Sequence, residues 1–147
     1  MTDLASKRPA RPEFRNIHAF KDLPSYRLPA PGIVSILHRI SGVLMFALLP
    51  FIIWMFDTSV SSEYSFARFK AAFNSGLGFV PGIVVKLVAL ALIWAFLHHF
   101  IAGLRHVWMD VSHAAVTKQR GTTTARITLL LSVLLTVALG AKLFGLY

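Results

Sequence analysis

Residues 83–107 read IVVKLVALALIWAFLHHFIAGLRHV, and this stretch decides how the chain folds. It is apolar apart from Lys86 near its start and a group of basic side chains toward its end. It exceeds the roughly 20 residues that an α-helix needs to cross a bilayer. We therefore expect a transmembrane helix over residues 81–108, with Pro81 suited to its first turn.

Two further apolar segments of spanning length lie on either side of this helix. Residues 33–56 precede it, and residues 127–146 follow it to the end of the sequence. Residues 1–30 form a polar, basic arm whose prolines interrupt regular structure. The sequence predicts an all-α membrane protein with three transmembrane helices, in which residues 1–147 form a single membrane-anchor domain.

The connection between the first two predicted spans carries a short amphipathic pattern. Phe66, Phe69 and Phe73 recur at i, i+3 and i+7, opposite Arg68 and Lys70. A narrow apolar face beside basic side chains is typical of a helix that lies in the membrane interface. We expect such a helix over residues 65–74.

The composition agrees with a membrane protein and limits its chemistry. Hydrophobic residues make up 56% of the chain and charged residues 14%, and the mean hydropathy is +0.66, which is high for a soluble domain. The sequence contains no cysteine, so disulfides, cysteine-ligated iron–sulfur clusters and thiolate zinc sites are excluded. Any metal chemistry must use the six histidines.

The basic residues indicate an orientation rather than a nucleic-acid partner. The net charge of +9 comes mostly from residues at the ends of apolar segments, especially in the arm and in the connection that holds Lys118, Arg120 and Arg126. The positive-inside rule then places the N-terminus in the cytoplasm. We expect a multi-pass protein of a bacterial inner (plasma) membrane, because no long presequence rich in Arg and Ser precedes the first span.

Four polar or small residues share one stripe of the first predicted helix. Ser35, His38, Arg39 and Gly42 fall at i, i+3, i+4 and i+7. A hydroxyl and a guanidinium at this depth can bind a quinone carbonyl or a carboxylate. Alternatively, Arg39 reaches the headgroup region and His38 bonds a neighbouring carbonyl, with no ligand involved.

A second stripe lies on the helix predicted over residues 81–108. His99, Gly103 and His106 fall at i, i+4 and i+7, and the glycine leaves room between two imidazoles. A neutral imidazole in an apolar bundle suits haem iron, and His38 and Arg39 reach the depth where haem propionates would lie, as does His106. His98 is the rival ligand, and structural hydrogen bonding or proton relay is the alternative role for these histidines.

Two strings of the sequence resemble the cytochrome b subunit of succinate dehydrogenase. They are Ser35-Ile36-Leu37-His38-Arg39-Ile40-Ser41-Gly42 and, some sixty residues later, His98-His99-Phe100-Ile101-Ala102-Gly103-Leu104-Arg105-His106. The resemblance covers roughly residues 8–110. The predicted third helix matches that family only in position and hydrophobicity.

The resemblance implies a role for individual residues. Ser35 and Arg39 would bind ubiquinone, with Ile36 lining the pocket, and His38 and Arg39 would approach the haem propionates. His99 would be the axial ligand of the haem iron, because the ligand in that family lies seven residues before the histidine of the Gly-x-Arg-His motif, here His106. The second axial ligand would come from another membrane subunit, so that haem b is shared.

The resemblance also implies partners and an activity. The chain would be the membrane anchor of succinate:ubiquinone oxidoreductase, working with a second hydrophobic subunit, an iron-sulfur subunit and a flavoprotein subunit that carry the iron–sulfur clusters and FAD. Ubiquinone would be the substrate, and no complete catalytic site would lie in this chain alone. The alternatives are the anchor of a quinol-fumarate reductase and a non-enzymatic small transporter subunit.

Overall fold

The computed structural model describes residues 18–22 and 25–147, and its regular elements there are helical. The elements follow one another as α1 (Ala19–Asp22), α2 (Ala30–Ala47), α3 (Leu49–Val60), α4 (Glu63–Asn74), α5 (Gly82–Val111), the 3-10 turn η1 (His113–Val116) and α6 (Lys118–Leu143). Most of the predicted arm of residues 1–30 lies outside the described residues.

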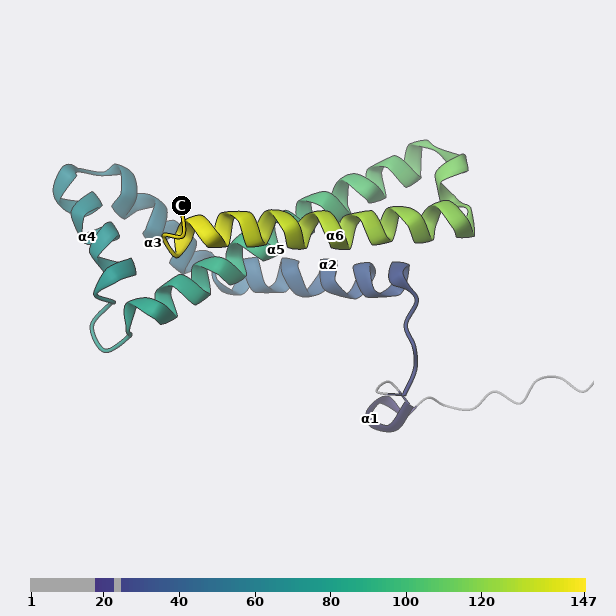
Figure 1. Cartoon of the computed structure of the whole chain (residues 1–147), viewed down its shortest axis with the longest axis horizontal. Coiled ribbons are helices and arrows are strands. Elements are labelled where there is room, and N and C mark those ends of the chain that lie inside the picture. Colours follow the sequence, from purple (N-terminus) through teal and green to yellow (C-terminus); the bar gives the residue numbers. More distant parts are fainter. Residues whose placement is uncertain (1–17, 23–24) are drawn as a thin grey trace, which may run out of the picture.

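Three of the helices are long and apolar enough to cross a membrane, namely α2, α5 and α6. In Figure 1, α5 runs obliquely across the bundle while α2 and α6 lie along it, and both pack against α5. The prediction of an all-α, multi-pass membrane protein is confirmed. A shorter helix between the first two spans, predicted over residues 65–74, is present as α4.

The first predicted helix is divided in two. We expected one helix over residues 33–56, but α2 ends at Ala47, Leu48 leaves helical geometry and α3 begins at Leu49. Pro50 explains the division, because it lacks the N–H that would bond the carbonyl of Phe46 and its ring crowds that carbonyl. The second part therefore takes a new direction toward α4 (Figure 1).

Helices α4 and α6 begin earlier than predicted and α5 ends later, whereas α6 ends at Leu143 rather than at residue 146. Helix α4 starts at Glu63, where the Ser62 hydroxyl accepts a hydrogen bond from the Ser65 N–H and the Ser65 hydroxyl accepts one from the Ser62 N–H. Helix α6 starts at Lys118 rather than at residue 127. Hydropathy marks the part of a helix that lies in lipid, whereas the helix itself continues through polar residues that extend beyond it.

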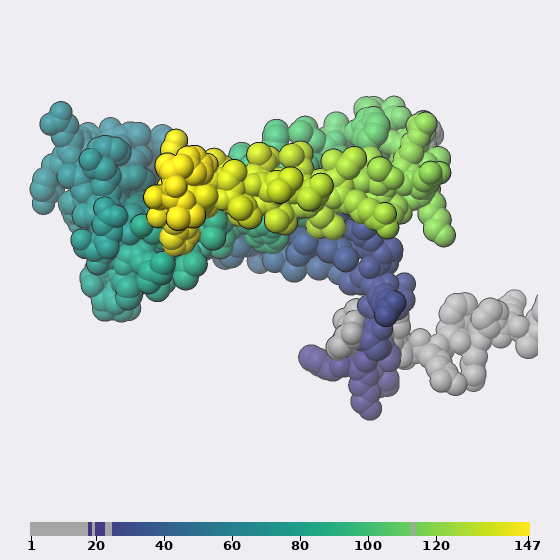
Figure 2. All heavy atoms as spheres, in the orientation of Figure 1, coloured from purple at the N-terminus to yellow at the C-terminus, as the bar shows by residue number. Residues whose placement is uncertain are grey.

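Small and polar side chains fill the centre of the bundle. Val34 of α2, Ala102 of α5 and Ala125 of α6 form its buried core, and Ala95 is also buried. Many large apolar side chains are exposed on the outside of the three helices instead, where α6 covers much of the face shown in Figure 2. Close packing through small residues and an apolar exterior are what a helix bundle in lipid requires, since lipid solvates the outside.

Candidate functional site

A cluster of three histidines lies between α2 and α5. The rings of His38 and His99 are stacked, with centroids 4.0 Å apart and planes 19° apart. The ring of His106, two turns further along α5, lies 5.4 Å from that of His38. The two stripes predicted from the sequence therefore meet at these residues.

Hydrogen bonds fix the orientation of the His99 ring. Its Nδ1 lies 3.0 Å from the carbonyl oxygen of His38 and 3.2 Å from the Ser41 hydroxyl, which itself donates to the same carbonyl at 2.8 Å. Because a carbonyl only accepts, Nδ1 carries the proton and donates it. The lone pair of the neutral ring is then on Nε2, which is the form that binds a metal.

Two glycines keep space around the cluster. A Cβ added at Gly42 would come within 3.1 Å of Cε1 of His99, so a larger residue there would require the ring to shift by a few tenths of an ångström. At Gly103 an added Cβ would meet a single atom, Nε2 of His38, at 3.9 Å. The ring of His38 therefore faces Gly103 and lies in the space between His99 and His106.

The neighbouring His98 faces the other way. Its side chain is fully buried, its Nδ1 lies 3.2 Å from the Ser132 hydroxyl of α6, and its ring stacks on Trp94. Its Nε2 has no hydrogen-bond partner among the described residues. A ring enclosed by the protein's own helices leaves no space for a haem, so the geometry favours His99 over His98 as the ligand.

Arg105 also belongs to the contact between α5 and α6. Its Nε donates to the Thr124 hydroxyl at 3.1 Å, and its NH2 group donates to the Gly121 carbonyl at 3.2 Å. The side chain is buried. Together with His98 and Ser132, these residues form a polar seam, by which we mean the hydrogen-bonded contacts that join α5 to α6.

The residues predicted to bind quinone lie on the outer side of α2. Ile36 and Arg39 are exposed and Ser35 is half-buried. Arg39 lines a shallow apolar groove with Ile40 and Val43. The structure thus separates the predicted stripe: His38 and Gly42 face α5, while Arg39 points away from it.

Ser41 was not singled out from the sequence, yet it is fully buried and touches both His38 and His99. Its position three residues after His38, on the face that also carries Gly42, is the signal that could have revealed it. Its hydroxyl holds the carbonyl and the imidazole in one arrangement.

The donor set fits a haem that takes one ligand from this chain. His99 presents Nε2, and Nε2 of His38 is buried without a partner, ready to donate to a carboxylate. A single protein nitrogen from this chain is what a haem iron, already held by its macrocycle, requires.

The fold and the histidine cluster define a class: a multi-pass membrane protein with an imidazole site between two spans. Comparison with known proteins identifies the family. Residues 8–139 match the model of the succinate dehydrogenase/fumarate reductase transmembrane subunit. The chain belongs to this family and is a subunit of a succinate:quinone oxidoreductase complex.

Individual relatives agree with this assignment. The succinate dehydrogenase cytochrome b556 subunit of Paracoccus denitrificans is 33% identical over 97 residues, which are 66% of this chain and 69% of the relative. The subunit of the same name from Rickettsia felis is 26% identical over 111 residues, 76% of this chain and 73% of the relative. That of Coxiella burnetii is 31% identical over 91 residues, 61% and 67% of the two chains.

Proposed function

We propose that the chain anchors a succinate dehydrogenase in a bacterial plasma membrane, helps to hold haem b and forms part of the site where ubiquinone is reduced. The observation that carries this proposal is the His38–His99–Ser41 arrangement, which leaves Nε2 of His99 as a free imidazole donor between two spans. The relatives named cytochrome b556 subunits support a b-type haem.

In the proposed haem site, each residue has a separate task. His99 would hold the haem iron through Nε2, while the His38 carbonyl keeps its Nδ1 protonated. His38, through its unpartnered Nε2, and His106 would bond the carboxylates of the propionates. Arg39 points away from α5, so it would add positive charge there only with its side chain turned toward the cluster. When bound, the haem supplies one-electron redox capacity.

In the proposed quinone site, the chain contributes one wall. Ser35 donates a hydrogen bond to a quinone oxygen, Arg39 stabilises the negative charge that develops there, and Ile36 packs on the ring. Two electrons and two protons convert ubiquinone to ubiquinol. Because Ile36 and Arg39 are exposed and Ser35 is half-buried, another subunit would supply the opposite wall and the protons.

The exposed outer face of α2 also supports the proposed assembly. A second hydrophobic subunit would cover it and donate the other axial ligand, while an iron-sulfur subunit and a flavoprotein subunit would dock at the end where α2 and α6 begin (Figure 1). That end carries Lys118, Arg120 and Arg126, so the positive-inside rule makes it cytoplasmic. No single subunit would then hold the whole electron path.

The two alternatives differ in what supports them. The family includes fumarate reductase subunits, so the physiological direction and the quinone type are decided by turnover measurements. The transporter alternative has no support from the comparisons.

The test is a purification of the intact complex through a tag on this chain. We expect b-type absorption bands in the dithionite-reduced minus oxidised spectrum, together with succinate-dependent ubiquinone reduction. A purified complex with neither property would contradict the proposal, and fumarate reduction by quinol that is faster than succinate oxidation would favour the reductase.

A further inference from the structure

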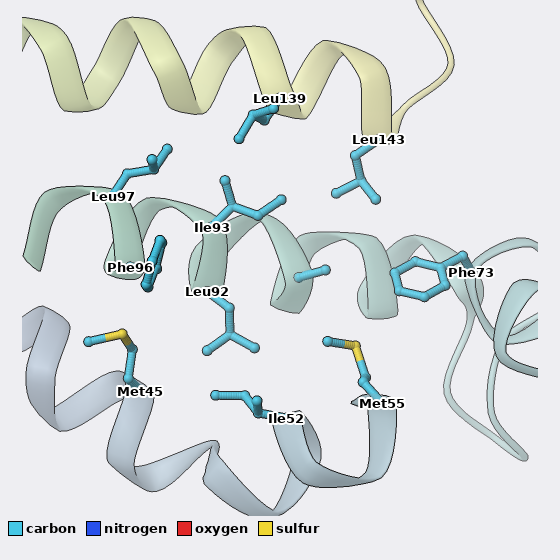
Figure 3. A pocket seen from close by; sticks show the side chains of 11 residues that line it. Met45, Ile52, Met55, Phe73, Leu92, Ile93, Phe96, Leu97, Leu139 and Leu143 are labelled. Atoms are coloured by element: carbon cyan, nitrogen blue, oxygen red, sulfur yellow. The ribbon is translucent and has the colours of Figure 1, made fainter. Parts of the chain in front are cut away.

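An apolar cavity begins next to the histidine cluster and extends from there toward the other end of the bundle. Its volume is about 520 Å³, and side chains from all three spans, from α3 and from α4 line it. Figure 3 shows Met45 and Ile52 pointing toward it from α2 and α3, Ile93 from α5 and Leu139 from α6. Its lining residues are all apolar, so it suits a hydrocarbon ligand.

The cavity results from the division of the first span. After the break at Leu48, α3 packs against α4 and the end of α2 but, within the described part of the chain, not against α5. In a membrane, an open apolar space of this size is filled by lipid, because unfilled walls lose their dispersion contacts.

The dimensions of the cavity match one leaflet. Along α5 its lining runs from Ala89 to Leu97, which at 1.5 Å per residue is about 12 Å. Half of a hydrocarbon core roughly 30 Å thick is about 15 Å. One acyl chain of a lipid in that leaflet therefore has the length to occupy the cavity.

A lysine lies where the headgroup of such a lipid would be. Lys86 is three, seven and eleven residues before Ala89, Ile93 and Leu97, so it continues the lining face of α5 one turn outward. Its ammonium is 5.8 Å from the centre of the Phe144 ring, which lines a neighbouring groove with Leu90 and Gly140. The positive charge thus lies beside the outer end of the cavity lining on α5, and not among the lining residues.

We propose that this cavity holds one acyl chain of an anionic phospholipid whose phosphate binds Lys86. This site would differ from ordinary contact with lipid in its preference for a negatively charged headgroup. One basic residue near the membrane surface raises the affinity for an anionic lipid about fivefold. The lining residues of the cavity do not include the haem and quinone residues, which lie nearer the start of α2 and the end of α5.

The first test fills the cavity in the intact complex. Leu139→Trp places a larger ring in the cavity, and Leu130→Trp is the matched control on the same helix, since Leu130 is exposed and does not line it. By native mass spectrometry, we expect wild type and Leu130→Trp to retain one phosphatidylglycerol that Leu139→Trp loses. Equal retention in all three complexes would overturn the proposal.

The second test addresses the headgroup. In complexes returned to nanodiscs, we expect Lys86→Gln to lower the preference for phosphatidylglycerol over phosphatidylcholine about fivefold, with Lys118→Gln at the other end as the control. An unchanged preference in Lys86→Gln would refute the phosphate contact. Recovery of a quinone tail, or a cross-link from Leu139 to a partner helix, would overturn the assignment to lipid.

Discussion

Two adjacent histidines on α5 have opposite surroundings. His99 turns toward α2, where its Nδ1 donates to the His38 carbonyl and, within the described part of the chain, its Nε2 has no hydrogen-bond partner. His98 turns toward α6 and is enclosed beside Ser132. The difference arises from the 100° rotation per residue of a helix. One face of α5 thus carries the proposed chemistry, while the other holds the bundle together.

This comparison predicts that variants will separate into two groups. Changes on the face toward α2, or on the outer side of α2, should alter haem content or quinone reduction. Changes in the polar seam toward α6 should lower stability and leave the spectrum unchanged. The four predictions below test that separation, beginning with the largest expected effect.

Arg39→Ala should lower ubiquinone reduction by succinate about ten- to hundredfold, because a hydrogen bond from a charged donor is worth about 1.5–3 kcal/mol. Haem content should change little, since His99 remains. Steady-state assays on the purified complex measure the first effect and the difference spectrum the second. Arg126→Ala is the control, because it removes an exposed arginine on α6. If Arg126→Ala lowered ubiquinone reduction as much as Arg39→Ala, Arg39 would have no specific role in the quinone site.

Gly42→Val should reduce the affinity for haem by at least about fivefold, because side chains larger than glycine push against Cε1 of His99 and overpacking costs about 1–3 kcal/mol. Haem titration of the apo-complex gives the affinity. Gly121→Val is the control, since a Cβ there meets no atom within 4 Å. Haem binding equal to wild type in Gly42→Val would show that the close approach of α2 to His99 is unimportant.

Arg105→Leu should lower the apparent melting temperature of the complex without changing its haem spectrum. The substitution removes two hydrogen bonds from α5 to α6, each worth about 0.6 kcal/mol in a membrane protein. A thermal shift assay in detergent gives the melting temperature. If the variant melted like wild type but lost haem, Arg105 would belong to the haem site instead of the seam.

Ser132→Ala and Ser41→Ala form the most sensitive pair, since each removes one hydroxyl beside one histidine. Ser132→Ala should cost about 0.6 kcal/mol of stability and leave haem unchanged. Ser41→Ala should shift the redox midpoint of the haem, because the hydroxyl touches the ring that would bind iron. Spectroelectrochemistry measures the redox midpoint of the haem in both variants. A shift in Ser132→Ala but not in Ser41→Ala would mean that the face of α5 toward α6 binds the haem.

Much of the fold could be predicted from the sequence because hydropathy reports directly on membrane spans. Residues 83–107 and the apolar runs on either side of them indicated the three spans, and the phenylalanine repeat indicated α4. The break at Leu48 was missed because Pro50 lies in a run of uniformly apolar residues, where only its missing N–H matters. The helical start of α6 was missed because polar residues carry no hydropathy signal.

The site was less predictable than the fold. Spacing identified His38, His99 and His106 as candidates, but it could not tell which of His98 and His99 faces α2, because both lie within the same apolar run. Which of the two histidines faces α2 depends on the rotation of α5 about its axis. The hydrogen bonds from α5 to α6, between His98 and Ser132 and between Arg105 and Thr124, hold α5 in the observed rotation. Ligand binding at Ser35, Ile36 and Arg39 stays a prediction, because another subunit must complete that site.

The measurement that tests the account most directly is the dithionite-reduced minus oxidised spectrum of the complex with wild-type chain, His99→Ala and His98→Ala. The account predicts that the b-type bands disappear with His99→Ala and remain with His98→Ala, whose complex should melt at a lower temperature. Bands that persist in His99→Ala, or that vanish only in His98→Ala, would contradict the assignment of the axial ligand.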